Sequence, residues 1–184
     1  MIAFSGRDHK SHSGCVYILD LKNRDKAAGR FVFDKPRGLY WDEAKSFLWV
    51  LDAGALTGCK FERASDGTFS LTRAKIISLV DKGSGLGCDL RPLPKSTNTV
   101  LAASMKGSVR FVDMKKMTWL ANRTTVPADA VNSYDVNSEG KAFFVRLRED
   151  GSGSDVLEKR QWGRRFIPYK KLKGVSVRRA RWVQ

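Results

Sequence analysis

The residues most able to bind a metal or take part in chemistry are the two histidines, because they lie close to a cysteine. His9, His12 and Cys15 fall within one short polar segment. Imidazole and thiolate groups are ligands that zinc prefers. However, a fourth ligand is not evident, and Arg7 and Lys10 would repel a cation. We therefore expect a polar hairpin loop here and assign no metal ligands.

The chain has three cysteines, an odd number that excludes a fully paired intrachain disulfide framework. Cys15, Cys59 and Cys88 each lie in or beside a strand-like run. A buried thiol in such a run behaves as a small apolar side chain. We expect that role for all three and leave the catalytic residues unknown.

The strongest compositional signal is a basic segment toward the C-terminal end. Between Lys159 and Gln184 there are ten basic residues and no acidic residue, and four aromatic residues are interleaved with them. Such side chains can bind phosphates and stack on bases, or bind sulfated and uronic-acid sugars through arginine forks. Alternatively, the aromatic residues pack a final sheet and the charges form a solvated face. The candidate anion-binding residues are Arg164, Arg165, Lys170, Lys171, Arg178, Arg179 and Arg181.

The whole chain shares this basic character. Its 184 residues include 34 Lys and Arg against 19 Asp and Glu, which gives a formal net charge of +15. That charge favours anionic partners such as nucleic acid, an anionic polysaccharide or a membrane surface. The hydrophobic content of 42% is that of an ordinary soluble protein. No apolar run reaches the roughly 18 residues that a membrane-spanning helix needs.

The elements that must position these groups are short strands. Strand-like runs separated by turn signals recur, for example Phe47–Leu51, Thr99–Ala103 and Ala142–Val145. Sustained apolar spacing of three and four residues is missing, so helices should be few. The runs align into four-strand units. These units open 49, 45 and 42 residues apart, at Gly38, Gly87, Asn132 and Gly174.

Four short strands in about 40–50 residues is the repeat of a β-propeller blade. We predict an all-β chain of about four blades, with Trp49 and Phe143 in the core between blades. A sandwich, the competing all-β fold, needs only about seven strands, whereas roughly fourteen candidate strands occur here. The predicted boundaries are 1–35 for part of a blade, 36–83, 84–128 and 129–173 for three blades, and 174–184 for the start of a further blade.

Three segments resemble the motifs of an uncharacterised, mostly bacterial family of six-bladed propellers. Pro36–Asp42 followed by Ser46–Leu51 resembles its "HG-x-x-WD … LW-x-L" blade, Gly87–Pro92 its "GHDL-x-P" segment, and Arg179–Trp182 its "ARW" ending. The blades are also similar to NHL and gluconolactonase-like repeats. The resemblance implies that this chain is an incomplete part of a six-bladed propeller, without the first one or two blades.

Two positions depart from that family pattern. The pattern has histidines where this chain has Arg37 and Cys88. If those histidines carry out chemistry in the family, the same chemistry is not expected in this chain.

The candidate ligand site follows from the propeller prediction, because ligands sit at one mouth of the central channel. The innermost strands would place a set of polar residues there. The predicted channel-mouth residues are Arg37, Cys88, Asp89, Asn132 and Asp135.

A gluconolactonase-like enzyme would hold a divalent metal such as calcium at this mouth with carboxylate and amide oxygens. Asp89, Asn132 and Asp135 would supply part of such a set. No glutamate is evident on the innermost strands. We therefore expect these groups to terminate strands and hydrate the channel, and we predict no cofactor.

Three classes of function remain open. We favour a non-catalytic binding or scaffold protein that recognises a polar or anionic small molecule or a glycan. The alternatives are a metal-dependent, lactonase-like hydrolase in the channel, and nucleic-acid binding through the basic C-terminal segment. Open blade faces would be apolar, so we also expect self-association.

The N-terminal residues Met1–Ser5 lack the basic flank and long apolar region of a signal peptide. They are typical of the end of a strand, which predicts that a segment upstream is missing. The compartment is left open. The family resemblance implies export if such an upstream segment exists.

Overall fold

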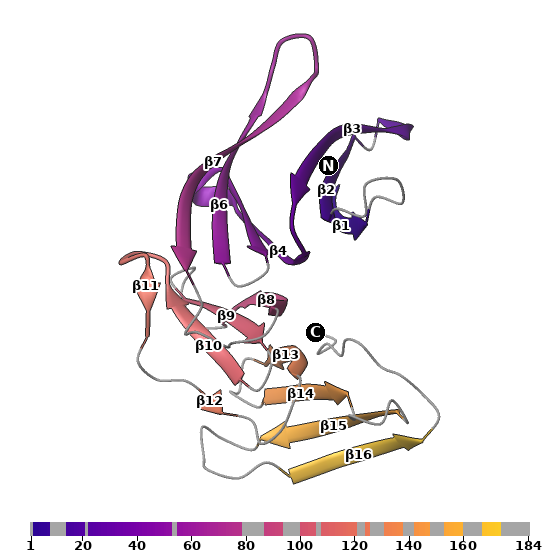
Figure 1. The fold of residues 1–184 in the computed structure, drawn as a ribbon, viewed down its shortest axis with the longest axis vertical. Helices are drawn as coiled ribbons and strands as arrows, with labels where there is room; N and C mark the ends of the chain where they lie inside the picture. Colours follow the sequence, from indigo (N-terminus) through magenta and orange to yellow (C-terminus); the bar gives the residue numbers. More distant parts are fainter. Residues whose placement is uncertain are drawn as a thin grey trace. The chain divides into compact units, whose positions relative to one another are not determined.

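The computed structural model is almost entirely β-structure, and its described residues include one short 3₁₀ helix (Figure 1). The strands pair antiparallel and follow one another in chain order within each sheet. The structure describes residues 2–7, 14–20, 22–52, 55–78, 87–93, 100–105, 108–120, 124–125, 131–137, 142–147, 153–159 and 167–173.

These residues form four sheets, which we name A to D. Sheet A contains β1 (Ile2–Arg7), β2 (Gly14–Asp20) and β3 (Asn23–Phe33). Sheet B contains β4 (Pro36–Asp42), the 3₁₀ helix η1 (Glu43–Lys45) in the first connection, β5 (Phe47–Asp52), β6 (Ala55–Arg63) and β7 (Phe69–Ser78).

Sheet C contains β8 (Gly87–Pro92), β9 (Val100–Met105), β10 (Ser108–Asp113), β11 (Thr118–Trp119) and β12 (Thr124–Thr125). Both β11 and β12 pair with β10, so the last strand of this sheet is divided into two short pieces. Sheet D contains β13 (Val131–Val136), β14 (Ala142–Leu147), β15 (Gly153–Lys159) and β16 (Ile167–Lys173).

A four-stranded antiparallel meander is the structure of a propeller blade. The prediction of an all-β chain with about four blades is therefore confirmed. The chain divides into two compact units, Met1–Gly87 and Cys88–Gln184. The first unit contains sheets A and B together with Gly87, the first residue of β8. The second unit contains the rest of sheet C and all of sheet D. Within the described ranges, no helix has the length and apolar character needed to cross a membrane.

The core of the first unit lies between sheets A and B. Alternate residues of a strand point to the same face, and this places Val16 and Ile18 of β2 together with Leu48 and Val50 of β5 in one buried cluster. Phe33 and Cys59 complete the cluster. Each such aliphatic side chain contributes about 1.5–3 kcal/mol when it is buried.

The opposite face of sheet B is also buried. Trp49, Leu51 and Leu56 are each 0% exposed, which confirms the predicted core role of Trp49. Its ring lies over Gly58, the residue opposite it on β6. A methyl group at Gly58 would come within 2.6 Å of the Trp49 ring. Glycine is therefore required there by close approach rather than by backbone conformation.

The second unit has its own core. Leu90 of β8, Val109 and Phe111 of β10, and Val145 of β14 are buried. Phe111 meets Tyr134 of β13 in an edge-to-face contact, with ring centroids 6.2 Å apart and an interplanar angle of 70°. This contact joins sheets C and D. Phe143, the second residue predicted for the core, lies in β14, but its side chain is outside the described residues.

Candidate functional site

The predicted channel-mouth residues all lie on the first strand of a sheet. Arg37 is in β4, Cys88 and Asp89 are in β8, and Asn132 and Asp135 are in β13. Arg37 is exposed, Asp89 is buried and Asp135 is partly buried, whereas the side chains of Cys88 and Asn132 lie outside the described residues. Arg37 belongs to the first unit and the others to the second. Their meeting at one mouth remains a prediction.

The first strands of the second unit carry buried polar side chains. Asp89 is 4% exposed and Ser133 is 1% exposed. Both engage other groups in the structure, as buried polar groups must if they are not to destabilise the fold. These two side chains therefore belong to the interior of the second unit.

Tyr134 is the residue of this region that the sequence analysis missed. Burial, and secondarily the negative charge of Asp135, raise the pKa of its phenol well above the ordinary value of 10.0. The phenol therefore keeps its proton to a higher pH than an ordinary tyrosine does. The sequence signal for its burial was its position between Ser133 and Asp135 in one strand. Successive side chains of a strand point to opposite faces, so Tyr134 lies on the face opposite these two polar residues.

Several carboxylates that could have served a ligand site instead stabilise turns. Asp42 is the N-cap of η1, and its Oδ1 accepts a hydrogen bond from the Lys45 amide at 3.3 Å. Asp113 Oδ1 accepts from the amides of Lys115 and Lys116, both at 2.9 Å. The latter bonds hold the pKa of Asp113 below its usual value, chiefly through the Lys116 amide.

These two turns share one design. Each begins with an aspartate, has a lysine three residues later and then a residue with positive φ, Ser46 at 52° and Met117 at 56°. The aspartate side chain satisfies amides that would otherwise be unpaired at the turn. Asp42, the second residue of the Trp41-Asp42 pair, therefore has a structural role in this turn.

Other aspartates have the same role. Asp66, at the tip of the β6–β7 hairpin, accepts bonds from the hydroxyl and the amide of Thr68, and these bonds lower its pKa. Asp52 accepts bonds from the amides of Asp34 at 3.1 Å and Lys35 at 2.5 Å, in the connection between sheets A and B. In the described part of the chain, no three His, Cys, Asp or Glu side chains gather as metal ligands.

The described thiols belong to the core. Cys15 and Cys59 are both 0% exposed, which confirms the predicted apolar role for these two. Burial raises the pKa of Cys59 to about 11, although the nearby Arg73 guanidinium acts in the opposite direction. A thiol with this pKa is a poor nucleophile at neutral pH. Residues 8–13, which contain both histidines of the proposed loop, lie outside the described residues.

Two arginines of the β6–β7 hairpin bind sheet A. Arg73 donates from Nη2 to the carbonyl oxygen of Val32 at 3.0 Å, and its guanidinium lies 4.9 Å from the centre of the Phe33 ring. Arg63 approaches Asp20 at 3.6 Å. These contacts join sheets A and B at the margin of the apolar cluster, to which Phe33 belongs.

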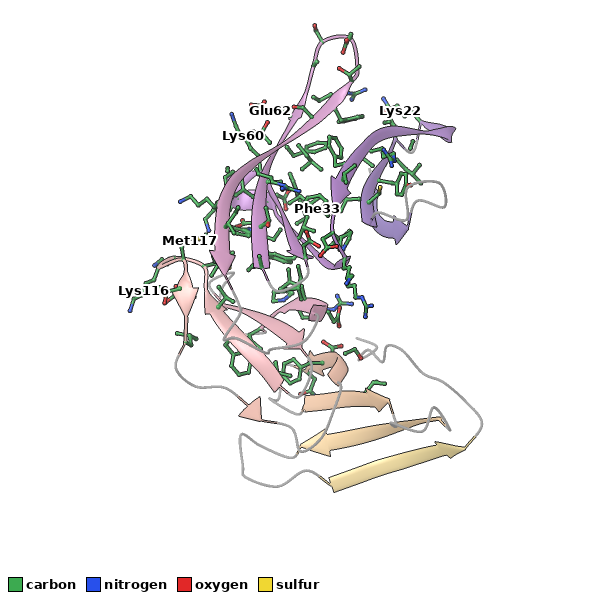
Figure 2. All side chains as sticks on the ribbon, viewed as in Figure 1. Lys22, Phe33, Lys60, Glu62, Lys116 and Met117 are labelled. Atoms are coloured by element: carbon green, nitrogen blue, oxygen red, sulfur yellow. The ribbon has the colours of Figure 1, made fainter. Side chains whose placement is uncertain are left out.

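The remaining basic residues of the described part are largely exposed. They include Lys22 between β2 and β3, Lys60 in β6 and Lys116 in the β10–β11 turn (Figure 2). Lys60 pairs with Glu62 at 2.5 Å on the same strand. Among the lysines and arginines whose side chains the structure describes, every one is exposed except Arg91.

The basic C-terminal segment is in part a strand. Lys170 and Lys171 lie in β16, which pairs with β15 and ends sheet D. Lysine and proline on an outer strand hinder unwanted pairing with other chains, and Pro168 lies in the same strand. Their side chains and the whole of Arg164, Arg165, Arg178, Arg179 and Arg181 are outside the described residues.

No family model matches the chain, and no curated protein matches it. Among solved structures, it is similar to a luciferin-regenerating enzyme, with 10% identity and a TM-score of 0.46. The match covers 79% of this chain and 47% of the other, so the chain spans about half the length of that structure. The fold of this chain is β-propeller-like, on the basis of the four antiparallel meanders described above.

Proposed function

We propose that this chain is a non-catalytic β-propeller protein that binds a polar or anionic small molecule or a glycan. The observation that supports this most directly is the unequal use of its charged side chains. Asp20, Asp42, Asp52, Asp66 and Asp113 accept hydrogen bonds from turn amides. The lysines whose side chains the structure describes are exposed, so we expect a positive field at the surface.

The size of the charge imbalance favours the same conclusion. A formal charge of +15 on 184 residues attracts anions. Arginine offers planar, paired donors that fit carboxylate and sulfate groups. In this proposal Arg37 and Asp89 belong to the channel mouth, and Arg164, Arg165, Lys170 and Lys171 add affinity for the anion.

The family resemblance gives this proposal its finer form. We propose that the sheets are blades of a six-bladed propeller related to the NHL and gluconolactonase-like repeats, with boundaries near residues 36, 84, 129 and 174. The motif segments Pro36–Asp42 and Ser46–Leu51 coincide with β4 and β5 and their turn, as a blade motif should.

The test compares two variants of equal charge. In the first, Arg164, Arg165, Lys170 and Lys171 are changed to Gln. In the control, the exposed residues Lys22, Lys75, Lys115 and Lys116 are changed to Gln. The measurement is the dissociation constant for heparin and for single-stranded DNA at several salt concentrations.

We expect the first variant to bind heparin at least about fourfold more weakly. An exposed ion pair contributes about 0.2–1 kcal/mol, so four of them contribute at least about 0.8 kcal/mol, and about 1.4 kcal/mol is a factor of ten. The control variant should lose much less. Equal losses would show that net charge rather than a site attracts the anion. Tighter binding of DNA than of heparin would favour the nucleic-acid alternative.

A further inference from the structure

Trp41 is the largest of the apolar side chains that are exposed in the described part of the chain. It is 44% exposed, whereas Trp49 in the adjacent strand is 0% exposed. Leu39, two residues before Trp41 on β4, packs against the cluster between sheets A and B. Because alternate residues of a strand point to the same face, Trp41 lies on that face as well. It therefore presents an aromatic ring to solvent at the margin of the core.

Contacts with two phenylalanines fix the position of this ring. Trp41 meets Phe61 of β6 edge-to-face, with ring centroids 5.8 Å apart and an interplanar angle of 84°. Phe61 in turn stacks on Phe69 of β7, with centroids 5.2 Å apart. We call these three residues the aromatic row, and two of them belong to the long β6–β7 hairpin (Figure 1). A ligand that stacks on Trp41 would meet a ring that is already oriented, which lowers the entropy cost of binding.

The arginines on the same face of the hairpin are already engaged by groups of the protein. Arg63, whose guanidinium lies 5.4 Å from the last ring of the aromatic row, has its Nη2 3.6 Å from Asp20 Oδ2. Arg73 donates to the carbonyl oxygen of Val32 and lies over the Phe33 ring. A phosphate or sulfate group at the row would compete with these contacts and would meet the carboxylate of Asp20. The row therefore favours a ligand that is recognised by shape and hydroxyl groups rather than by negative charge.

A neutral oligosaccharide has this chemistry. One face of a pyranose ring consists of C–H groups, which the negative face of an aromatic ring attracts. The hydroxyl groups around the sugar both donate and accept hydrogen bonds, and the Arg63–Asp20 pair beside the aromatic row supplies a donor and an acceptor. A nucleic-acid base would also stack on Trp41, but its phosphates would lie near Asp20.

We propose that Trp41 is the stacking platform of a binding site for a neutral oligosaccharide, in which Arg63 and Asp20 bind hydroxyl groups. These residues all belong to the first unit, whereas the predicted anion-binding residues belong to the second. The inference rests on the proposed function, because it takes the glycan as the ligand, and it adds a second contact surface that does not depend on charge.

The test measures the binding of four neutral sugars, cellohexaose, xylohexaose, mannohexaose and chitohexaose, by isothermal titration calorimetry. At least one of them should bind the unchanged protein. Trp41→Ala should bind that sugar at least about fivefold more weakly, the lower end of the effect of replacing an aromatic stacking residue by alanine. Trp41→Phe keeps a ring and should lose less. The control Ile76→Ala removes a side chain that is 65% exposed on β7 and should bind normally.

Nuclear magnetic resonance of the unchanged protein provides a local readout that does not depend on how a variant folds. The indole N–H signal of Trp41 should shift when the bound hexasaccharide is added. The signal of Trp49 should not, because that ring is fully buried. No binding of any of the four sugars, equal binding by Trp41→Ala, or a Trp41 signal that does not move would each overturn the proposal.

Charged ligands distinguish this site from the proposed anion site. Trp41→Ala should keep its affinity for heparin, and the variant with Arg164, Arg165, Lys170 and Lys171 changed to Gln should keep its affinity for the neutral sugar. Loss of heparin binding alone would contradict the proposed anion site and leave the stacking platform intact. If Trp41→Ala instead loses affinity for single-stranded DNA and the sugars do not bind, the platform recognises bases and the proposal is wrong.

Discussion

Cys59 shows how the position of a side chain in the core determines its chemistry. With a pKa of about 11 against 9.0 for an ordinary thiol, its thiolate fraction at pH 8 is lower by about two orders of magnitude. We expect iodoacetamide to label Cys59 in the native protein at least a hundredfold more slowly than in urea. Mass spectrometry of the peptide that contains Cys59 measures this. Equal rates would place the thiol at an accessible surface.

The same residue links pH to stability. Because the folded state holds the thiol proton more tightly than the unfolded state, the folded state binds more protons between the two pKa values. The stabilisation is complete below about pH 9 and declines as the pH rises from about 9 to 11. Cys59→Ser should lose the decline between about pH 9 and 10. Above pH 10 a decline remains in both proteins, because the pKa of Tyr134 is also raised.

Single residues of the candidate site were only partly predictable. The strand positions of Asp89 and Asp135 follow from the repeat. The use of aspartates at turns does not, because it depends on which amides the folded backbone leaves unpaired. In two of the turns the sequence does contain a pattern, an Asp followed three residues later by Lys, at Asp42 and Asp113. The same spacing also occurs in solvent-exposed ion pairs, so the pattern alone does not show that the aspartate caps a turn.

Among the elements, the connection from β4 to β5 depends on one side chain. Asp42 is 3% exposed, caps η1 and contacts Lys45 Nζ at 3.3 Å. Asp42→Ala should lower the free energy of unfolding by about 1–2 kcal/mol, in the range measured for helix N-caps. Urea denaturation measures the loss. Asp42→Asn retains a cap acceptor but no charge.

The asparagine variant identifies which interaction matters. A half-exposed ion pair contributes little, so Asp42→Asn should recover most of the stability that the alanine variant loses. If Asn is as damaging as Ala, the contact with Lys45 rather than the cap stabilises this turn.

Strands with a clear apolar run were predictable, and strands that begin with polar residues were not. Phe47–Leu51 was predicted as a strand and lies in β5, and Trp49 was predicted in the core and is fully buried. The 11-residue strand β3 was missed. It begins with Asn-Arg-Asp-Lys, and its pairing with β2 rather than its own composition makes it a strand. Local propensity is a weak guide where cross-strand contacts decide.

At the scale of the whole molecule, the net charge should oppose folding. The +15 charges repel one another more strongly in the compact state than in the extended one. The Debye length falls from about 30 Å at 0.01 M salt to about 8 Å at 0.15 M. We expect the thermal midpoint to rise with sodium chloride over that range, as measured by scanning fluorimetry.

The control variant of the heparin experiment provides a comparison for this salt dependence. In it, four exposed lysines are changed to Gln: Lys22, Lys75, Lys115 and Lys116. It carries four fewer positive charges, so its midpoint should rise less with salt. A midpoint that is independent of salt in both proteins would mean that the charges are too far apart, or too well neutralised, to affect folding.

The strict chain order of the strands within each sheet has a consequence for how the protein is made. Every strand pair joins neighbours in sequence, apart from the second piece of the divided strand in sheet C, so most contacts that define a sheet are local, and local contacts form fast. At about 5–20 residues per second on the ribosome, a unit of 45 residues takes roughly 2–9 s to emerge. Sheets B, C and D can therefore form one after another during synthesis, each before the next is translated. Sheet A would emerge first.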